Sequence, residues 1–366
     1  MAIKNFWWLL IWMFLFGAVS YLFIPQQGEI VLGRRVRRWS WLPAVILAAP
    51  YVIWAAWRTD AYGDTSIYRQ AFKALPVGMA QLGEYLSNTT KDRGFVLFEY
   101  LFKTLISRSD VAFFFLVAFI QIFCLVAVYR KYSRNYWLSL FFFVASTDYL
   151  SWMFNGMRQF LAAAIIFACI PLITKRKYFG MVLAVLLASQ IHLTALIFLP
   201  FIFIVNGRAW NFRTILFIIG IIASVYFLDL VTGFITEALQ DTSYEGDIEI
   251  FLNDDGTNIM RVLFYSVPAV MAWFFRGRID AADDPMINIC ANLSVVAAGI
   301  YVFSFFTSGI LVGRLPIYFS LANYILIPWL LREAFNRDSA IVLECVFVLV
   351  YSAFFYYQCG PTWGLI

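Results

Sequence analysis

The sequence contains little charge for its length. Only 13% of its 366 residues are charged, whereas 63% are hydrophobic and 20% are aromatic. Soluble domains contain about 25% charged and about 45–50% apolar residues. A shortage of charge on this scale excludes an ordinary soluble enzyme, a disordered chain and a small secreted scaffold, and it predicts a membrane protein.

Residues that bind metals are also scarce. The only histidine is His192, and the five cysteines are scattered without CxxC, CxxH or HExxH spacing. A conventional zinc, haem or iron–sulfur site therefore lacks ligands, and we expect neither a metal nor another cofactor. The net charge of +5 is divided among short basic clusters rather than one stripe, which argues against nucleic acid as a partner.

Long apolar runs account for most of the chain. A membrane-spanning helix needs about 20 mostly apolar residues. Runs of this kind lie near 6–24, 41–57, 110–129, 136–153, 157–174, 214–234, 259–275, 286–306, 315–331 and 339–357. The first run follows Lys4 but lacks a clear A-x-A cleavage site, so we interpret it as a retained helix and not as a signal peptide.

Basic clusters predict the orientation, because short inner loops are rich in Lys and Arg. Placing all the clusters inside, from Arg34–Arg38 to Arg332 and Arg337, forces the stretch 179–206 to enter and leave on one side. This stretch is then a hairpin of two short helices with His192 at its outer tip. The fold class predicted is all-α: a single polytopic membrane domain over 1–366, with about 12 spans and both termini outside.

Two large outer loops remain in this topology. The loop 58–109 carries mixed charge and ends in an amphipathic segment, Phe95 to Ile106, which we expect to lie in the outer interface. The loop 235–258 is acidic and contains no Lys or Arg. Both loops are expected on the outer side of the membrane.

Three arginines are predicted near the outer surface, at the depth of His192. Arg158, Arg261 and Arg314 each lie near the outer end of a span, where an arginine can simply snorkel to the headgroups. Guanidinium groups at one depth repel each other unless an anion lies between them, and their planar fork suits phosphate oxygens. The pattern predicts a phosphate or diphosphate headgroup as ligand.

Other polar residues have two interpretations each. His192 is either a hydrogen-bonded structural residue or a general base, since imidazole titrates near working pH. Asp64 either starts a helix that runs towards Leu75 or accepts a proton. The intramembrane acids Asp148, Asp229 and Glu344 would suit a proton relay in a transporter.

Five short motifs lie between about residues 55 and 330. They are Gly63-Asp64 with Tyr68, Asp92-Arg93-Gly94-Phe95, Met157-Arg-Gln-Phe-Leu-Ala162, Ile191-His-Leu-Thr-Ala-Leu196 and Gly313-Arg-Leu-Pro-Ile-Tyr-Phe319. In sequence and in order they resemble the motifs of the EpsG-type family of bacterial polysaccharide polymerases, which are similar in role to the Wzy O-antigen polymerases. The second motif departs from the family's acidic-Pro-Gly-aromatic pattern at Arg93.

The resemblance implies a glycosyltransferase of the bacterial inner membrane, of the kind that makes O-antigen, lipopolysaccharide or capsule. Such an enzyme transfers a growing glycan from undecaprenyl diphosphate to a lipid-linked repeat unit on the periplasmic face. A chain-length regulator is an additional expected partner besides the lipid substrates and the bilayer. An O-antigen ligase-like transferase, another lipid-linked sugar transferase and a lipid-linked oligosaccharide flippase are the alternatives.

These expectations assign a role to each candidate residue. Arginines that stabilise charge on the leaving diphosphate would supply the main catalytic effect without a metal. The catalytic candidates are Arg158 and Arg314 on the diphosphate, and His192 or else Asp64 as the base. The substrate-binding candidates are Arg69, Arg93, Arg261, Gln159, Tyr68 and Tyr318.

Overall fold

The chain folds into two compact units of helices. The computed structural model describes residues 6–23, 26–60, 63–239 and 248–365. The structure is 77% helical, and its described residues contain one two-stranded sheet. The first unit comprises residues 1–168, 187–193 and 331–366, and the second comprises 169–186 and 194–330.

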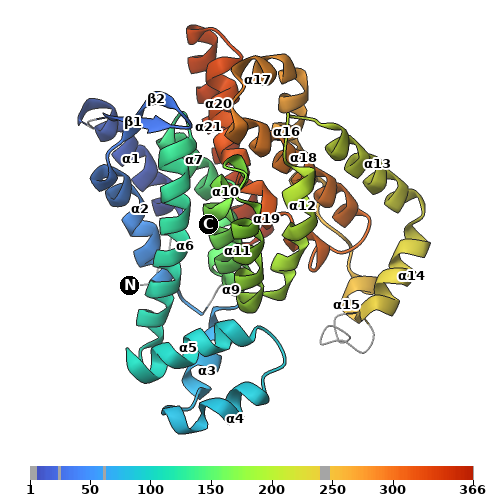
Figure 1. Ribbon diagram of the computed structural model, residues 1–366. Helices are drawn as coiled ribbons and strands as arrows, with labels where there is room; N and C mark the ends of the chain where they lie inside the picture. The colour runs from blue at the N-terminus through green and yellow to red at the C-terminus, as the bar shows by residue number, and fades with distance from the viewer. Residues whose placement is uncertain (1–5, 24–25, 61–62, 240–247, 366) are drawn as a thin grey trace. The chain divides into compact units, whose positions relative to one another are not determined.

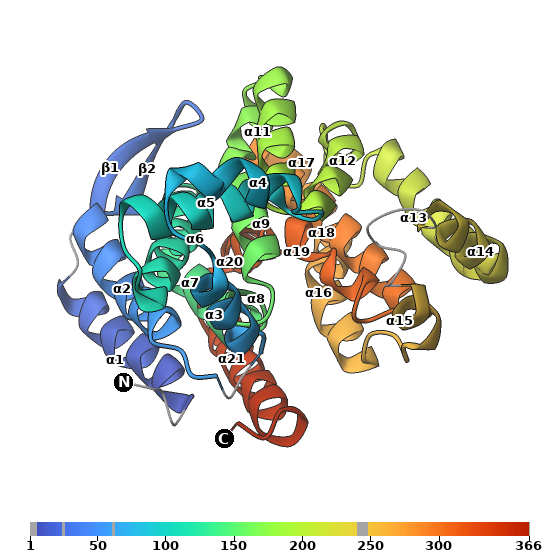
Figure 2. The same cartoon turned by 90° about the horizontal axis from the view of Figure 1, so that it is seen from below.

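The first unit contains both ends of the chain and is built around a long helix, α6 (Asp110–Tyr132). Its other elements, several of which appear in Figures 1 and 2, are α1 (Trp7–Phe23), β1 (Gln26–Val31), β2 (Arg34–Trp39), α2 (Trp41–Ala56), α3 (Thr65–Ala74), η1 (Met79–Gln81), α4 (Leu82–Ser87), α5 (Arg93–Leu105), α7 (Tyr136–Ala145), α8 (Asp148–Met153), α9 (Met157–Cys169), the end of α11 (Tyr178–Ile191), the end of α20 (Asn323–Glu333), α21 (Arg337–Tyr357) and η5 (Gln358–Thr362).

Helix α6 separates two polar ends of this unit. A helix of 23 residues is about 35 Å long, enough to cross the hydrocarbon core of a bilayer. The β1–β2 hairpin lies at one end of α6, and α3, α4 and α5 lie at the other (Figure 1). A crossing of the bilayer by α6 would place these two ends on opposite sides of the membrane.

The hairpin corrects the prediction of a plain basic loop at Arg34–Arg38. Residues 26–31 and 34–39 pair in antiparallel register, joined by Leu32 and Gly33 at φ 49° and 79°. Two central residues with positive φ make the tight turn whose twist matches that of the strands. The strands were not predicted because four of the six residues in 34–39 are arginines, and arginine has no marked preference for β-strands.

The loop 58–109 is mostly helical. Its amphipathic segment forms α5, which buries one face through Phe95, Glu99, Tyr100, Phe102 and Lys103. Lys103 Nζ donates to the carbonyl oxygens of Phe72, Lys73 and Leu75 at 2.8, 2.8 and 2.5 Å. Because these carbonyls lie at the end of α3, the ammonium group caps α3 and holds it against α5.

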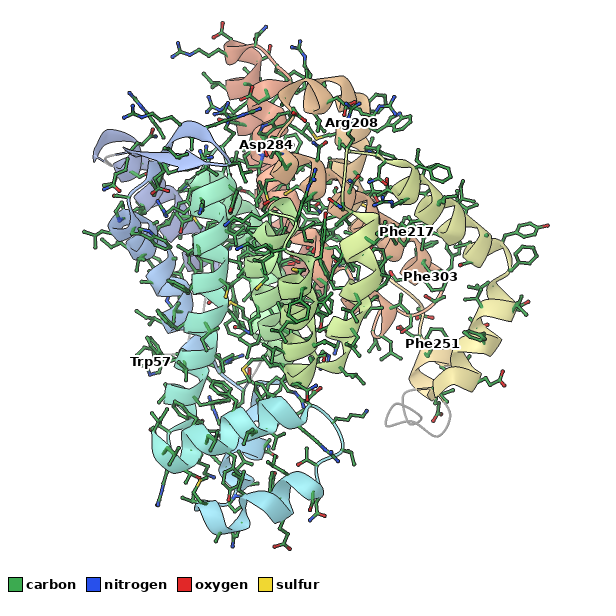
Figure 3. The ribbon with its side chains drawn as sticks, viewed as in Figure 1. Trp57, Arg208, Phe217, Phe251, Asp284 and Phe303 are labelled. Carbon is green, nitrogen blue, oxygen red and sulfur yellow. The ribbon has the colours of Figure 1, made fainter. Side chains whose placement is uncertain are left out.

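The second unit is built around α18 (Pro285–Phe305), which packs against α13 and α16. Asp284 and Phe303 mark opposite ends of α18 in Figure 3, and the Asp284 carboxylate accepts hydrogen bonds from the amides of Met286 and Ile287. The unit also contains α10 (Pro171–Thr174), the start of α11, η2 (Leu193–Ile197), α12 (Phe198–Ile204), α13 (Phe212–Tyr226), α14 (Leu228–Leu239), α15 (Ile248–Asn253), α16 (Ile259–Phe274), α17 (Arg276–Ala282), η4 (Val312–Arg314), α19 (Ile317–Ser320) and most of α20.

The stretch 179–206 forms the expected hairpin. Helix α11 ends at Ile191, and the chain returns through η2 and α12. Asn206, just after α12, donates through Nδ2 to the hydroxyl of Tyr178 at the start of α11, at 2.7 Å. This bond joins the two open ends of the hairpin, so the turn at residues 191–193 is its tip.

The number of spans differs from the sequence prediction. Four described helices are long and apolar enough to cross a membrane, and up to seven spans result if each bent helix pair counts once. The run 136–153 is not one helix, because Thr147 adopts φ 69° between α7 and α8. The membrane fold is therefore helical, as expected, while the twelve-span topology remains a prediction. The acidic loop falls partly on residues 240–247, outside the described ranges, together with Asp241, Glu245 and Asp247.

Candidate functional site

A buried carboxylate, Asp92, lies at the centre of the polar cluster in the first unit. Its side chain is only 4% exposed, and Oδ2 lies 3.0 Å from Arg158 Nη1. His192 Nδ1 lies 3.1 Å from both carboxylate oxygens. One anion thus contacts two of the residues that the sequence singles out as catalytic candidates.

The local backbone explains how these three residues meet. Asp92 precedes α5 with a left-handed φ of 54°, Arg158 is in the first turn of α9, and His192 directly follows α11. A Cβ on Gly94 would lie 2.6 Å from the carbonyl oxygen of Gln190. Only glycine lets the start of α5 approach the end of α11 so closely, which brings Asp92 to His192.

Aromatic rings and a second carboxylate surround Arg158. Its guanidinium carbon lies 5.7 Å from the centre of the Tyr68 ring and 5.9 Å from that of Phe95. Burial raises the pKa of the Tyr68 hydroxyl, which therefore stays neutral. Asp64 precedes α3 and lies 3.2 Å from the Asn155 amide nitrogen, once that amide is oriented to donate.

Gly63 packs the chain beside Asp64. Its φ is +64°, and an added Cβ would lie 2.9 Å from the carbonyl oxygen of Phe154. The segment before α3 therefore contacts the segment before α9. The motifs that contain Gly63-Asp64, Asp92, Arg158 and His192 are thus gathered in one region of the first unit.

The remaining candidates in this unit have other contacts. Arg69 forms ion pairs with Asp60 at 2.9 Å and Asp110 at 2.7 Å, which ties α3 to the start of α6. Arg93 is exposed, and its Nε donates to the carbonyl oxygen of Thr89 at 2.8 Å. Gln159, which follows Arg158 in the sequence, is buried.

Two charged residues near the cluster were not among the sequence candidates. Arg58 is buried, donates to the Met153 carbonyl oxygen, and lies 4.4 Å from the centre of the Phe114 ring. Burial lowers its pKa to about 10, so the group remains charged at neutral pH. Glu99 is 6% exposed on α5, and burial raises its pKa to about 7 against the opposing effects of Arg158 and Lys103.

Sequence reasoning also gave Asp92 no role. Asp92 begins one of the five motifs, two residues before Gly94, and this position was the available indication. Its contacts with Arg158 and His192 follow from its left-handed backbone and from the close approach at Gly94, which the sequence does not show. For Glu99 the signal was its spacing. Phe95, Glu99 and Phe102 are four and three residues apart, so they share one helix face, and that face is buried.

Arg314, Arg261 and Tyr318 lie in the second unit. Arg314 ends η4, and the Arg261 guanidinium carbon lies 5.7 Å from the centre of the Tyr265 ring. The Tyr318 hydroxyl is 2.9 Å from Thr194 Oγ1, so α19 contacts the returning arm of the hairpin. Convergence of Arg261 and Arg314 with Arg158 stays a prediction, since the three arginines belong to different units.

The fold defines an all-helical membrane protein with a carboxylate-centred polar cluster beyond the end of one long helix. The family model described as the EpsG family matches residues 41–359 of the chain. The match covers most of the protein, so the chain belongs to the EpsG family, a family of Wzy-like polysaccharide polymerases. Searches of curated proteins and of solved structures found no match.

The contact at Gly94 predicts a stability difference between two glycines. Gly94→Ala forces α5 away from α11 and should lower the free energy of unfolding by about 1–3 kcal/mol. Gly83→Ala is the matched control, because Gly83 lies in helix α4 with nothing within 4 Å of an added Cβ. The control should be neutral or stabilising by up to about 1 kcal/mol. Thermal unfolding followed by tryptophan fluorescence compares the two, and equal melting temperatures would contradict the packing described.

Glu99 predicts a pH dependence of stability. Its pKa is about 7 in the folded protein, above its ordinary value, so the folded state retains a proton that the unfolded chain has lost. Stability should therefore fall as pH rises from about 4.5 to about 7 and stay low above that range, by about 3 kcal/mol in all. Glu99→Gln should abolish this decline, as measured by denaturation at pH 5 and pH 8. An unchanged decline in the variant would assign the effect to other groups.

Proposed function

We propose that this protein is an oligosaccharide repeat-unit polymerase. It would transfer a glycan from an undecaprenyl-diphosphate donor to a lipid-linked acceptor on the periplasmic face of the bacterial inner membrane. Membership of the EpsG family supports the reaction class. The observation that carries the assignment to residues is the Asp92 carboxylate, which contacts both Arg158 and His192.

Arg158 is the proposed diphosphate ligand in this unit. The transfer breaks the bond between the anomeric carbon and the phosphate oxygen, and the diphosphate leaves with the electron pair. A guanidinium already in place stabilises that developing charge better than mobile water does. One Arg158 nitrogen contacts Asp92, yet 36% of the side chain is exposed, so further donors remain for phosphate oxygens.

His192 is the proposed base. A carboxylate only accepts hydrogen bonds, so Nδ1 beside Asp92 carries the ring proton and Nε2 keeps its lone pair. As the acceptor hydroxyl oxygen bonds to the anomeric carbon, its proton would pass to Nε2. Asp92 would then act as a positioning residue that fixes the tautomer and stabilises the imidazolium. Asp64 remains the second candidate for the base.

Other residues would bind rather than react. Tyr68, whose ring lies beside Arg158, is the proposed aromatic contact for the glycan, and exposed Arg93 could contact the glycan or the lipid phosphate. The Phe95 ring also lies beside Arg158 but is buried in the core. Arg69 is ion-paired with Asp60 and Asp110, which favours a positioning role over ligand binding. Arg314 is retained as a second proposed diphosphate ligand, and Arg261, Gln159 and Tyr318 are retained as proposed substrate contacts, on the strength of residue type and motif. A chain-length regulator is a further proposed partner.

The contacts of two intramembrane acids favour a transferase over a transporter. Glu344 accepts two hydrogen bonds from Arg332 at 2.5 and 2.7 Å, and Asp148 accepts one from the Trp152 indole at 3.1 Å. A proton relay needs carboxylates that can exchange protons along a path. These two acids are instead held in local contacts.

The proposal predicts how substitutions of the cluster affect polymerisation by purified protein supplied with a lipid-linked repeat unit. Arg158→Lys keeps the charge but removes the fork, and the turnover number should fall about 10–100-fold. Asp92→Asn should cause a comparable loss, because the amide no longer selects the tautomer of His192. Arg337→Lys, an exposed arginine at the start of α21, is the control and should retain wild-type turnover.

Full activity of Arg158→Lys would contradict bidentate binding of the diphosphate. If Asp92→Asn were fully active while His192→Gln lost activity, His192 would remain the proposed base and Asp92 would have no role in the mechanism. Active variants at all three positions would overturn the assignment of the site.

A further inference from the structure

A second polar region lies at the other end of the first unit. An open cavity of about 1440 Å³ is formed by the β1–β2 hairpin, the end of α1, the turn between α6 and α7, and the end of α20. Within this unit the hairpin and α5, which begins beside Asp92, lie at opposite ends of α6 (Figure 1). The cavity is therefore separate from the proposed catalytic cluster, and that reaction does not use it.

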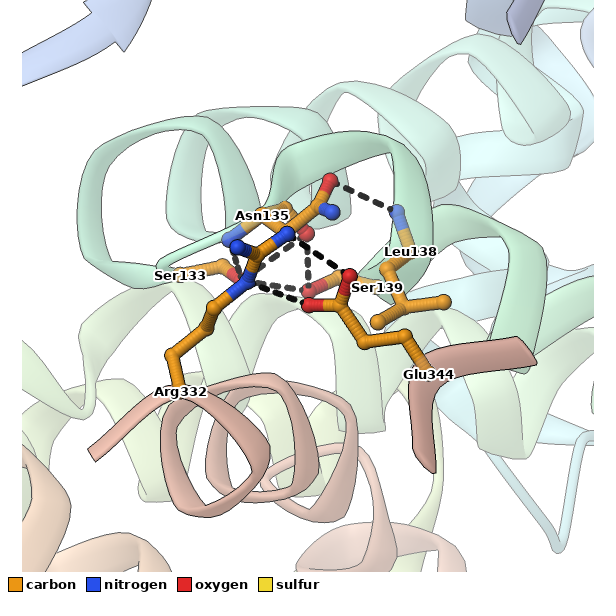
Figure 4. Close-up of polar contacts among 6 residues, drawn as sticks. All are labelled: Ser133, Asn135, Leu138, Ser139, Arg332 and Glu344. Carbon is orange, nitrogen blue, oxygen red and sulfur yellow. Dashed lines mark hydrogen bonds and ion pairs between the residues drawn. The ribbon is translucent and has the colours of Figure 1, made fainter. Parts of the chain in front are cut away.

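Arginine dominates the lining of this cavity. Three of the lining arginines have carboxylate partners: Arg130 pairs with Glu29 at 2.7 Å, Arg134 pairs with Glu333, and Arg332 pairs with Glu344 (Figure 4 shows the last pair). These pairs also hold the walls together, because they join β1 to α6, the α6–α7 turn to α20, and α20 to α21. The lining arginines are Arg35, Arg37, Arg38, Arg130, Arg134 and Arg332.

The hairpin adds charge that these carboxylates do not balance. Arg35 and Arg37 are exposed, and within the described ranges neither has a carboxylate partner. Being two residues apart on β2, they project from the same face of the hairpin. Arg38 is buried and donates to the carbonyl oxygens of Lys131 and Arg37 at 2.7 and 3.2 Å, so it fixes β2 against the end of α6. Such a group of guanidiniums favours an anion with several oxygens, and phosphate suits their fork.

The surroundings of the cavity favour a lipid as the source of that phosphate. Gly17 and Ser20 of α1 line it, and α1 also carries exposed apolar side chains, with Leu15 60% and Val19 53% exposed. Trp137, also in the lining, donates from Nε1 to the Met13 carbonyl oxygen at 2.9 Å and so holds α7 to α1. A headgroup in the cavity would have its acyl chains beside these apolar side chains.

We propose that this cavity binds the phosphate headgroup of an anionic membrane lipid in the leaflet opposite the catalytic cluster. The basic hairpin assigns that leaflet to the cytoplasmic side, where anionic lipids attract clustered arginines. Arg35 and Arg37 contact the phosphate, while the ion-paired arginines keep the cavity open. The bound lipid would fix the hairpin against α6 and α7.

Native mass spectrometry of the purified full-length protein tests this proposal, with phosphatidylglycerol and phosphatidylcholine added to separate samples. The wild type should retain phosphatidylglycerol in preference to phosphatidylcholine. Arg35→Gln/Arg37→Gln should lower the affinity for phosphatidylglycerol at least about tenfold. Arg276→Gln/Arg278→Gln is the matched control, because it removes two exposed arginines at the same spacing and should leave the affinity unchanged.

Competition with soluble pyrophosphate separates the two sources of phosphate. The lipid should remain bound when pyrophosphate is added, because its chains contribute to binding. Tight binding of pyrophosphate, with no preference for phosphatidylglycerol over phosphatidylcholine, would identify the ligand as a soluble phosphate and overturn the proposal. Equal affinity for phosphatidylglycerol in the hairpin variant, the control and the wild type would overturn it as well.

Discussion

The arrangement of the first unit depends on one buried carboxylate and its two neighbours, a guanidinium and an imidazole. Asp92 is almost inaccessible to water, and a buried carboxylate is tolerated only where partners replace its hydration. Arg158 and His192 supply those partners from α9 and from the tip after α11. Three segments far apart in sequence are thereby held to one point, and Gly94 permits the approach. The same contact gives His192 a defined orientation.

The rest of the first unit supports this point from a distance. Lys103 caps α3, and Arg69 joins α3 to the start of α6, so these contacts hold the small helices beyond the end of α6 together. At the opposite end, ion pairs join the hairpin to the end of α6 and the end of α20 to the turn between α6 and α7. A charged side chain in the middle of a membrane helix costs several kcal/mol of free energy, so charged side chains are expected near the two ends of such a helix.

The sequence predicted the membrane class, the hairpin at 179–206, the helix that begins after Asp64 (α3) and the amphipathic helix α5. Each of these depends on a local pattern of residues. It did not predict the break at Thr147 or the β-hairpin, since both depend on backbone conformations that composition hides. Arg158 and His192 were predicted as site residues from residue type and motif, and the structure brings both to Asp92. Asp92 was missed as their partner, because a contact over 66 or 100 residues has no local signature, and Arg69 could not be recognised as ion-paired for the same reason.

One measurement tests the central contact directly, because the chain contains a single histidine. Nitrogen-15 NMR of protein labelled only in histidine reports which ring nitrogen of His192 carries the proton. The account predicts that neutral His192 carries it on Nδ1, facing Asp92, and that Asp92→Asn shifts the proton towards Nε2. A wild-type ring protonated on Nε2 would contradict the account, since the proposed base would then have no free lone pair for the acceptor hydroxyl.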